Sequence, residues 1–141
     1  MENKITSKQL AIAAIEAMKK SYSPYSNFTV GAALLTKDGK IYTGANIENA
    51  SYTPTVCAER NAIFTAVHQG ERDFKAIAIV GGLRGDITGI TAPCGVCRQV
   101  MSEFCSPDFK VILVTSNEGD YEETTLGELL PYTFSLKEKA L

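Results

Sequence analysis

Two short stretches decide the fold and chemistry of this chain: Cys57-Ala58-Glu59-Arg60 and Pro93-Cys94-Gly95-Val96-Cys97-Arg98-Gln99. Cys57, Cys94 and Cys97 have the residue type and spacing of three ligands of a tetrahedral zinc site, and a catalytic zinc leaves its fourth position to water. Glu59 follows Cys57 by two residues. A carboxylate that does not bind the metal, but lies beside it, is the expected proton carrier of a hydrolytic reaction. The two stretches therefore predict a hydrolytic zinc centre.

Both stretches are predicted to begin helices. Proline suits the first turn of a helix, as at Pro93. The amide groups and partial positive charge at a helix N-terminus lower the pKa of a thiol. Cys94 and Cys97 share one face of a helical turn, while Cys57 approaches from the other helix. The positive ends of two helices are therefore expected to point at one metal.

The rest of the pattern alternates helices with strands. Helices are expected at 6–20, 56–67 and 93–104, strands at 28–35, 41–45, 75–80 and 111–115, a loop at the glycines 81–89, and a short helical turn at 125–130 followed by a tail. The apolar run 75–80 is typical of a strand covered on both faces. This order favours a mixed sheet between helices.

Composition and charge narrow the functional class. With 141 residues, the chain is expected to form a single domain over 1–141. Its net charge of -2 argues against a nucleic-acid partner, because such surfaces gather Lys and Arg. Neither a membrane-spanning run nor a signal-peptide pattern is evident in the sequence, so a cytoplasmic location is expected.

Several motifs in the same order resemble the small, homotetrameric cytidine deaminases, whose superfamily carries a zinc signature with a three-cysteine variant. The resemblance runs from Tyr22 to Phe134. It rests on both zinc stretches and on Phe28-Thr29-Val30-Gly31-Ala32-Ala33, Asn46-Ile47-Glu48-Asn49-Ala50-Ser51-Tyr52 and Glu128-Leu129-Leu130-Pro131. It implies a three-layer α/β/α fold with a mixed sheet of about five strands.

The resemblance also implies the reaction. One Zn²⁺ per subunit would serve the hydrolytic deamination of cytidine and 2′-deoxycytidine to uridine and 2′-deoxyuridine plus ammonia, in pyrimidine salvage. Glu59 would carry the protons while water adds at C4 of the base. The expected partner is a small nucleoside, and the expected assembly is a homotetramer with shared active sites.

Further site residues follow from the same resemblance. Arg60 is expected to hydrogen-bond to the ligand sulfurs, where it would offset the negative charge of three thiolates on one zinc. The substrate-binding residues are expected to be Phe28 against the base, Asn46 and Glu48 on the sugar hydroxyls, the backbone at Ala58 on the base edge, Tyr52 in the pocket wall, and Phe134 reaching a neighbouring subunit's site.

Three alternatives remain open at the level of sequence. A deaminase of a cytosine-containing antibiotic of the blasticidin type would share the zinc motifs. A structural zinc protein would need a fourth protein ligand, and Cys105 lies too far along its helix, while His68 is expected on the surface. A thiol-disulfide oxidoreductase would explain Cys94 and Cys97 but not Cys57 or Glu59. Cys105 is expected to be a buried, inert thiol.

Overall fold

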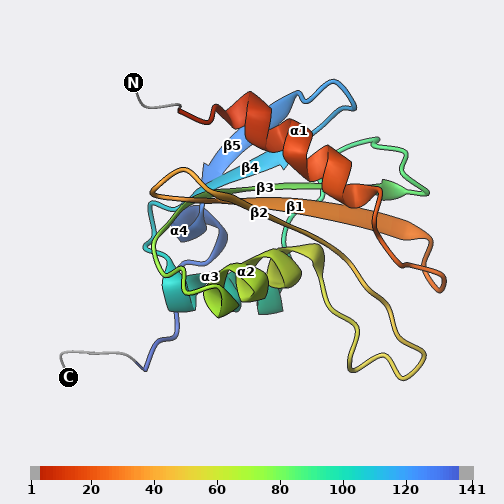
Figure 1. Cartoon of the computed structure of the whole chain (residues 1–141). Helices are drawn as coiled ribbons and strands as arrows, with labels where there is room; N and C mark the ends of the chain where they lie inside the picture. Colours follow the sequence, from red (N-terminus) through yellow and green to blue (C-terminus); the bar gives the residue numbers. More distant parts are fainter. Residues whose placement is uncertain (1–3, 137–141) are drawn as a thin grey trace.

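Figure 1 shows the computed structural model of the chain, which describes residues 4–136. The elements are α1 (Ser7–Met18), β1 (Phe28–Thr36), β2 (Ile41–Ala45), α2 (Ala58–His68), β3 (Phe74–Leu83), α3 (Gly95–Phe104), β4 (Lys110–Val114), β5 (Tyr121–Thr125) and α4 (Leu126–Leu129). The two ends of the domain expected over 1–141 lie outside the described residues. No helix within residues 4–136 has the length and apolar character needed to cross a bilayer.

The five strands form one mixed sheet in the order β2-β1-β3-β4-β5. The neighbours β3 and β4 are parallel, and the other three pairs are antiparallel. A parallel pair needs a crossover connection, which here contains α3. The predicted mixed sheet of about five strands is therefore confirmed.

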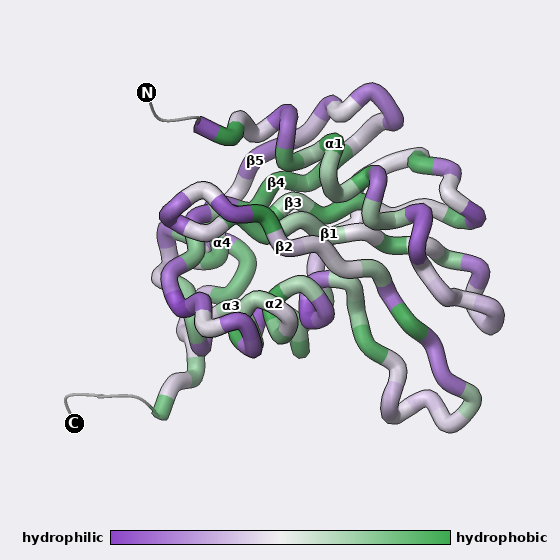
Figure 2. The backbone as a smooth tube through the Cα atoms, in the orientation of Figure 1, coloured by the Kyte–Doolittle hydropathy of each residue, from purple (hydrophilic) through white to green (hydrophobic). Residues whose placement is uncertain are grey.

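Helices cover both faces of the sheet, as Figure 1 shows: α1 lies on one face, and α2, α3 and α4 lie on the other. Side chains alternate along the strands, so that Leu34 and Ile77 enter the core under α2 and α3, while Leu35 and Ala78 enter the core under α1. Figure 2 shows hydrophobic residues concentrated along β3 and β4, between the helical layers. This is the expected α/β/α sandwich.

Glycines bring the helices close to the sheet. A Cβ added at Gly44 in β2 would lie 2.5 Å from the Ala58 carbonyl oxygen and 2.6 Å from the Ala62 amide nitrogen. On the other face, a Cβ added at Gly31 would lie 2.1 Å from the Ala14 carbonyl oxygen. Helix α2, which begins beside Cys57, is therefore seated directly on the backbone of β2.

Two predictions from the sequence are wrong. The loop expected over 81–89 begins later, because Gly81 and Gly82 belong to β3. A Cβ added at Gly82 would lie 2.0 Å from the Asp86 carbonyl oxygen. These glycines permit a close approach of the following loop and do not end the strand. The sequence pattern also predicts no strand after 111–115, whereas Tyr121–Thr125 forms β5 at the edge of the sheet.

Candidate metal centre and active site

Two of the three predicted metal ligands stand at the start of a helix. Cys57 is the N-cap of α2 and Cys94 is the N-cap of α3, both with extended backbone, and neither side chain makes a capping hydrogen bond. Each sulfur is therefore free to face another partner, next to the positive end of its helix. Cys97 lies one turn into α3 and is fully buried.

The three sulfur atoms form one cluster. The Cys57 and Cys94 Sγ atoms are 3.8 Å apart, those of Cys94 and Cys97 are 3.5 Å apart, and all three lie within 4.8 Å of one another. Within residues 4–136 this is the one group of three or more His, Cys, Asp or Glu side chains close enough to share a metal ion. The donor set is that of a zinc site with an open fourth position.

The pKa values of the cysteine thiols indicate that this cluster favours a bound cation. A hydrogen bond from Cys97, with further help from Arg60, lowers the pKa of Cys57 to about 5. The pKa of Cys97 is raised, because its proton is held against the neighbouring Cys57. Three adjacent thiols cannot all ionise unless positive charge is placed among them. A divalent metal supplies that charge, so these residues fit zinc.

Arg60 contacts one sulfur of the cysteine cluster. Its Nη2 donates to the Cys57 Sγ at 3.4 Å, from the first turn of α2. Its Nε is buried and has no hydrogen-bond partner among the described residues. The guanidinium therefore contributes positive charge directly beside the cysteine cluster.

Glu59 is a buried acid next to the same cluster. Its side chain is on the first turn of α2, and the residue is only 3% exposed. Burial raises the pKa of Glu59 to about 7, against the opposing effect of hydrogen bonds from its own backbone and from Cys97. A carboxyl group with a pKa near neutrality can both accept and release a proton, which is the property a general acid/base requires.

Asn46 is buried at the end of β2 and holds the start of β1. Its Oδ1 accepts hydrogen bonds from the Val30 amide at 2.9 Å and from the Ser21 hydroxyl, and its Nδ2 donates to the Phe28 carbonyl at 2.8 Å. Since a side-chain amide carries two N–H groups, one donor of Asn46 remains for another partner.

Glu48 is held by the loop that precedes β1. One carboxylate oxygen accepts from the amides of Tyr25 at 2.9 Å and Ser26 at 3.1 Å, and the other accepts from the Ser26 hydroxyl. The Ser26 hydroxyl is the main cause that keeps the pKa of Glu48 below its ordinary value. Glu48 therefore carries a full negative charge at neutral pH.

A cavity of about 410 Å³ opens beside Glu48. It is lined by Tyr25, Ser26, Glu48, Asn49, Tyr52 and Thr55. The structure thus brings together Glu48 and Tyr52, which the sequence predicted for the site. It adds Tyr25 and Ser26, which sequence reasoning missed although both lie just before Phe28.

The other expected site residues are distributed around this region. Phe28 is partly exposed at the start of β1, and Ala58 is buried as the first residue of α2. Phe134 is 65% exposed, and its carbonyl accepts a hydrogen bond from Gln99 Nε2 at 3.1 Å. The tail that carries Phe134 is therefore attached to α3, the helix that holds two of the cysteines.

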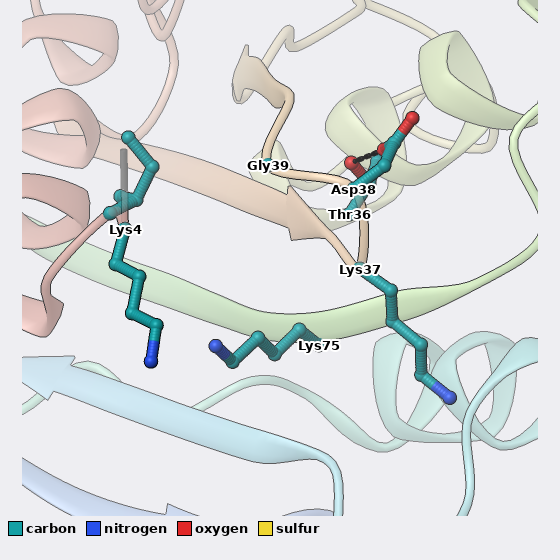
Figure 3. A pocket seen from close by; sticks show the side chains of 7 residues that line it. Lys4, Thr36, Lys37, Asp38, Gly39 and Lys75 are labelled. Carbon is teal, nitrogen blue, oxygen red and sulfur yellow. Dashed lines mark hydrogen bonds between the residues drawn. The ribbon is translucent and has the colours of Figure 1, made fainter. Parts of the chain in front are cut away.

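A second cavity, of about 470 Å³, lies at the opposite end of β1 from Phe28. It is lined by Lys4, Ile5, Thr36, Lys37, Asp38, Gly39 and Lys75. Figure 3 shows that the side chains of Lys37 and Asp38 point away from Lys4 and Lys75. These exposed side chains do not converge on a common point, and none of them belongs to the cysteine cluster.

The remaining cysteine and histidine lie apart from the cluster. Cys105 caps the C-terminal end of α3, and burial raises the pKa of its thiol to about 12. His68 is exposed at the last residue of α2. His68 thus lies on the surface, as expected, whereas Cys105 is partly rather than fully buried.

Comparison with known proteins places this site in a family. The family model described as "Cytidine and deoxycytidylate deaminase zinc-binding region" matches residues 4–114. The cytidine deaminase of Sporosarcina psychrophila is 53% identical over 120 residues, which cover 85% of each chain. That of Halalkalibacterium halodurans is 51% identical over 125 residues, covering 89% of this chain and 91% of the relative.

A solved structure agrees with these relatives. The crystal structure of cytidine deaminase from Burkholderia pseudomallei superposes with a TM-score of 0.84 at 50% identity, covering 92% of this chain and 100% of that chain. A blasticidin-S deaminase of Bacillus cereus is more distant, at 36% identity over 110 residues, which cover 75% of this chain and 76% of that protein. The chain therefore belongs to the family of cytidine and deoxycytidylate deaminases that carry this zinc-binding region.

Proposed function

We propose that the protein is a zinc hydrolase that deaminates cytidine and 2′-deoxycytidine to uridine and 2′-deoxyuridine, with release of ammonia. The observation that carries the proposal is the buried Glu59 beside three clustered cysteine sulfurs at two helix N-termini. The 53% identity to a cytidine deaminase over most of the chain favours this substrate over other amines.

Cys57, Cys94 and Cys97 would hold one Zn²⁺ per subunit. When bound, the zinc polarises the attacking water. Glu59 accepts a proton from that water as its oxygen adds to C4 of the base, and passes the proton to the ring N3. Glu59 then takes the proton of the new C4 hydroxyl and passes it to the amino group; the C4–N bond breaks, the C4 carbonyl of uridine forms, and ammonia leaves.

Arg60 offsets the charge of the site. Three thiolates and one divalent cation carry a net charge of −1, which weakens the pull of the metal on water. The Arg60 guanidinium, 3.4 Å from the Cys57 sulfur, withdraws negative charge from that ligand. We expect Arg60 to tune the reactivity of the centre without touching the substrate.

The nucleoside would be held by residues around β1 and β2. Phe28 covers the base, the backbone at Ala58 contacts the base edge, and Glu48 accepts a hydrogen bond from the 3′-hydroxyl. Asn46 donates its remaining N–H to a sugar hydroxyl, because its oxygen already accepts two hydrogen bonds. These contacts use only features that cytidine and 2′-deoxycytidine share.

The assembly is proposed to be a homotetramer in which neighbouring subunits complete each site. Tyr52 and Phe134 are 75% and 65% exposed in the single chain, and exposed large apolar side chains can mark an interaction surface. Burial of both residues at subunit contacts would close the site around a nucleoside. A cytoplasmic enzyme of pyrimidine salvage, acting on free nucleosides rather than on nucleic acid, fits the net charge of -2.

The test is loss of absorbance with cytidine, 2′-deoxycytidine, cytosine and blasticidin S as separate substrates. Both nucleosides should be deaminated, and cytosine should be poor, because binding energy from the sugar supports the chemical step. Turnover of blasticidin S alone would favour the antibiotic deaminase. Zinc binding with no turnover of any substrate would favour a structural zinc protein.

A further inference from the structure

The Ser26 hydroxyl hydrogen-bonds to two residues that are proposed to contact different parts of the nucleoside. It donates to one carboxylate oxygen of Glu48, and it accepts a hydrogen bond from the Phe28 amide at 3.0 Å. Glu48 is proposed to bind the sugar, and Phe28 is proposed to cover the base. A single side chain therefore lies between the two groups that would hold the two halves of a nucleoside.

The loop around Ser26 is built to present donors to Glu48. The amides of Tyr25 and Ser26 donate to the other oxygen of the carboxylate, so that three donors from two adjacent residues face one acid. Asn27 then turns the chain with a φ of 59°, and its carbonyl accepts a hydrogen bond from the Arg84 amide at 2.7 Å. The loop is thus anchored to the end of β3.

The hydrogen bonds from the Ser26 loop fix the Glu48 carboxylate before the substrate binds. A glutamate has three rotatable side-chain bonds, and a half-exposed one loses binding energy if those bonds must be ordered when the ligand arrives. Hydrogen bonds to the charged form keep the carboxylate ionised and fix its direction before binding. Carboxylate oxygens accept more than one hydrogen bond each, so capacity for a sugar hydroxyl remains.

We infer that Ser26 is a positioning residue for substrate binding, which fixes Glu48 so that it can accept a hydrogen bond from the 3′-hydroxyl of the nucleoside. The inference rests on the proposed contact between Glu48 and the sugar. It also assigns a role to a residue that lines the cavity of about 410 Å³ and that no metal or proton-transfer role requires.

The experiment compares S26A, E48A and the double variant S26A/E48A, each assayed with cytidine and with 3′-deoxycytidine. In S26A, kcat/KM for cytidine should fall about tenfold, the effect of one hydrogen bond to a charged group. With 3′-deoxycytidine the same variant should change less than twofold, because the hydroxyl that Glu48 binds is missing. The double variant should be no worse than E48A, since Ser26 acts through Glu48.

The matched control is S106A. Ser106 also donates its hydroxyl to a carboxylate two residues away, that of Asp108, on an exposed turn outside the site. This variant should keep parental kcat/KM with both substrates. Thermal melting of every variant is the measurement that checks whether each one is folded.

The outcomes separate this inference from the proposal on which it rests. If E48A loses activity with cytidine only, but S26A affects both substrates equally or neither, the role of Ser26 is overturned and the sugar contact stands. If E48A changes kcat/KM equally for cytidine and 3′-deoxycytidine, Glu48 does not bind the 3′-hydroxyl. The proposed role of Ser26 is then overturned as well. A loss confined to cytidine in both single variants supports both.

Discussion

At the scale of single residues, Glu59 tests the proposed chemistry most directly. Glu59→Gln keeps the size of the side chain and its capacity for hydrogen bonds but cannot move protons. We expect a folded protein with its zinc and a kcat reduced by roughly 10²–10⁴-fold, the range of general acid/base catalysis. Metal analysis and cytidine turnover on the same sample measure both. If most activity remained, the proton transfer would belong to another group.

The cysteines provide a second test with an internal control. Cys94→Ala removes one of three sulfurs, so zinc and activity should both be lost, and Cys57→Ala and Cys97→Ala should behave alike. Cys105→Ala deletes a thiol outside the cluster, at the far end of α3, and should keep about one zinc per chain. Retention of full zinc by Cys94→Ala would contradict this ligand set.

These residues could be predicted from the sequence because their spacing reflects local geometry. Cys94 and Cys97 must share a helical turn, and Glu59 must follow Cys57 closely to lie beside the same metal. The contact of Ser26 with Glu48 could not be predicted in this way. The two residues lie on separate loops, and they meet only because the segments before β1 and after β2 run together.

At the scale of elements, the contact between β2 and α2 positions the metal site. Gly44→Ala would place a Cβ 2.5 Å from the Ala58 carbonyl oxygen, so α2 must move away from the sheet. We expect a loss of about 1–3 kcal/mol in the free energy of unfolding, typical of overpacking, together with weaker zinc binding. Chemical denaturation and zinc titration measure the two effects.

Gly31→Ala is the matched control. Its added Cβ would lie 2.1 Å from the Ala14 carbonyl oxygen in α1, on the opposite face of the sheet. This variant should lose comparable stability but keep the zinc affinity of the parent, because α1 carries no ligand. Equal zinc affinity in the parent, Gly44→Ala and Gly31→Ala would mean that the packing of α2 on β2 does not control metal binding.

Helices and buried strands could be predicted from the sequence, but the edge of the sheet could not. Strand β3 carries an apolar run that only a strand covered on both faces explains. Strand β5, Tyr-Glu-Glu-Thr-Thr, is mostly exposed, has two adjacent acids and shows no hydrophobic alternation. Its conformation is fixed by hydrogen bonding to β4, and that information is absent from its own side chains.

At the scale of the whole molecule, the exposed tail tests the proposed assembly. Phe134→Ala removes a side chain that is 65% exposed while leaving the backbone contact with Gln99 in place. If Phe134 completes a neighbour's site, activity should fall at least tenfold, as for loss of a buried aromatic contact, with zinc unchanged. Removal of residues 131–141 should have the same or a larger effect.

Leu136→Ala is the control in the same tail, since Leu136 is 85% exposed and has no assigned role. Sedimentation of the parent should give a species near four times the chain mass of 15.2 kDa. A fully active monomer at assay concentration would rule out shared sites. The assembly is the part of the interpretation that no pattern within one chain encodes, because it depends on surfaces that meet only between chains.

The starts of α2 and α3 have a consequence for the fate of the protein in the cell. Each helix begins at a cysteine that makes no capping hydrogen bond, where a serine or aspartate would contribute about 1 kcal/mol. A metal bound to both cysteines would instead tie the two helix starts together, so that folding and metal binding become linked equilibria. When zinc is scarce, we expect the free energy of unfolding to be lower, so that the metal-free chain is degraded faster than the metal-bound one. Supply of the metal would then set how much enzyme exists, as well as how fast it works.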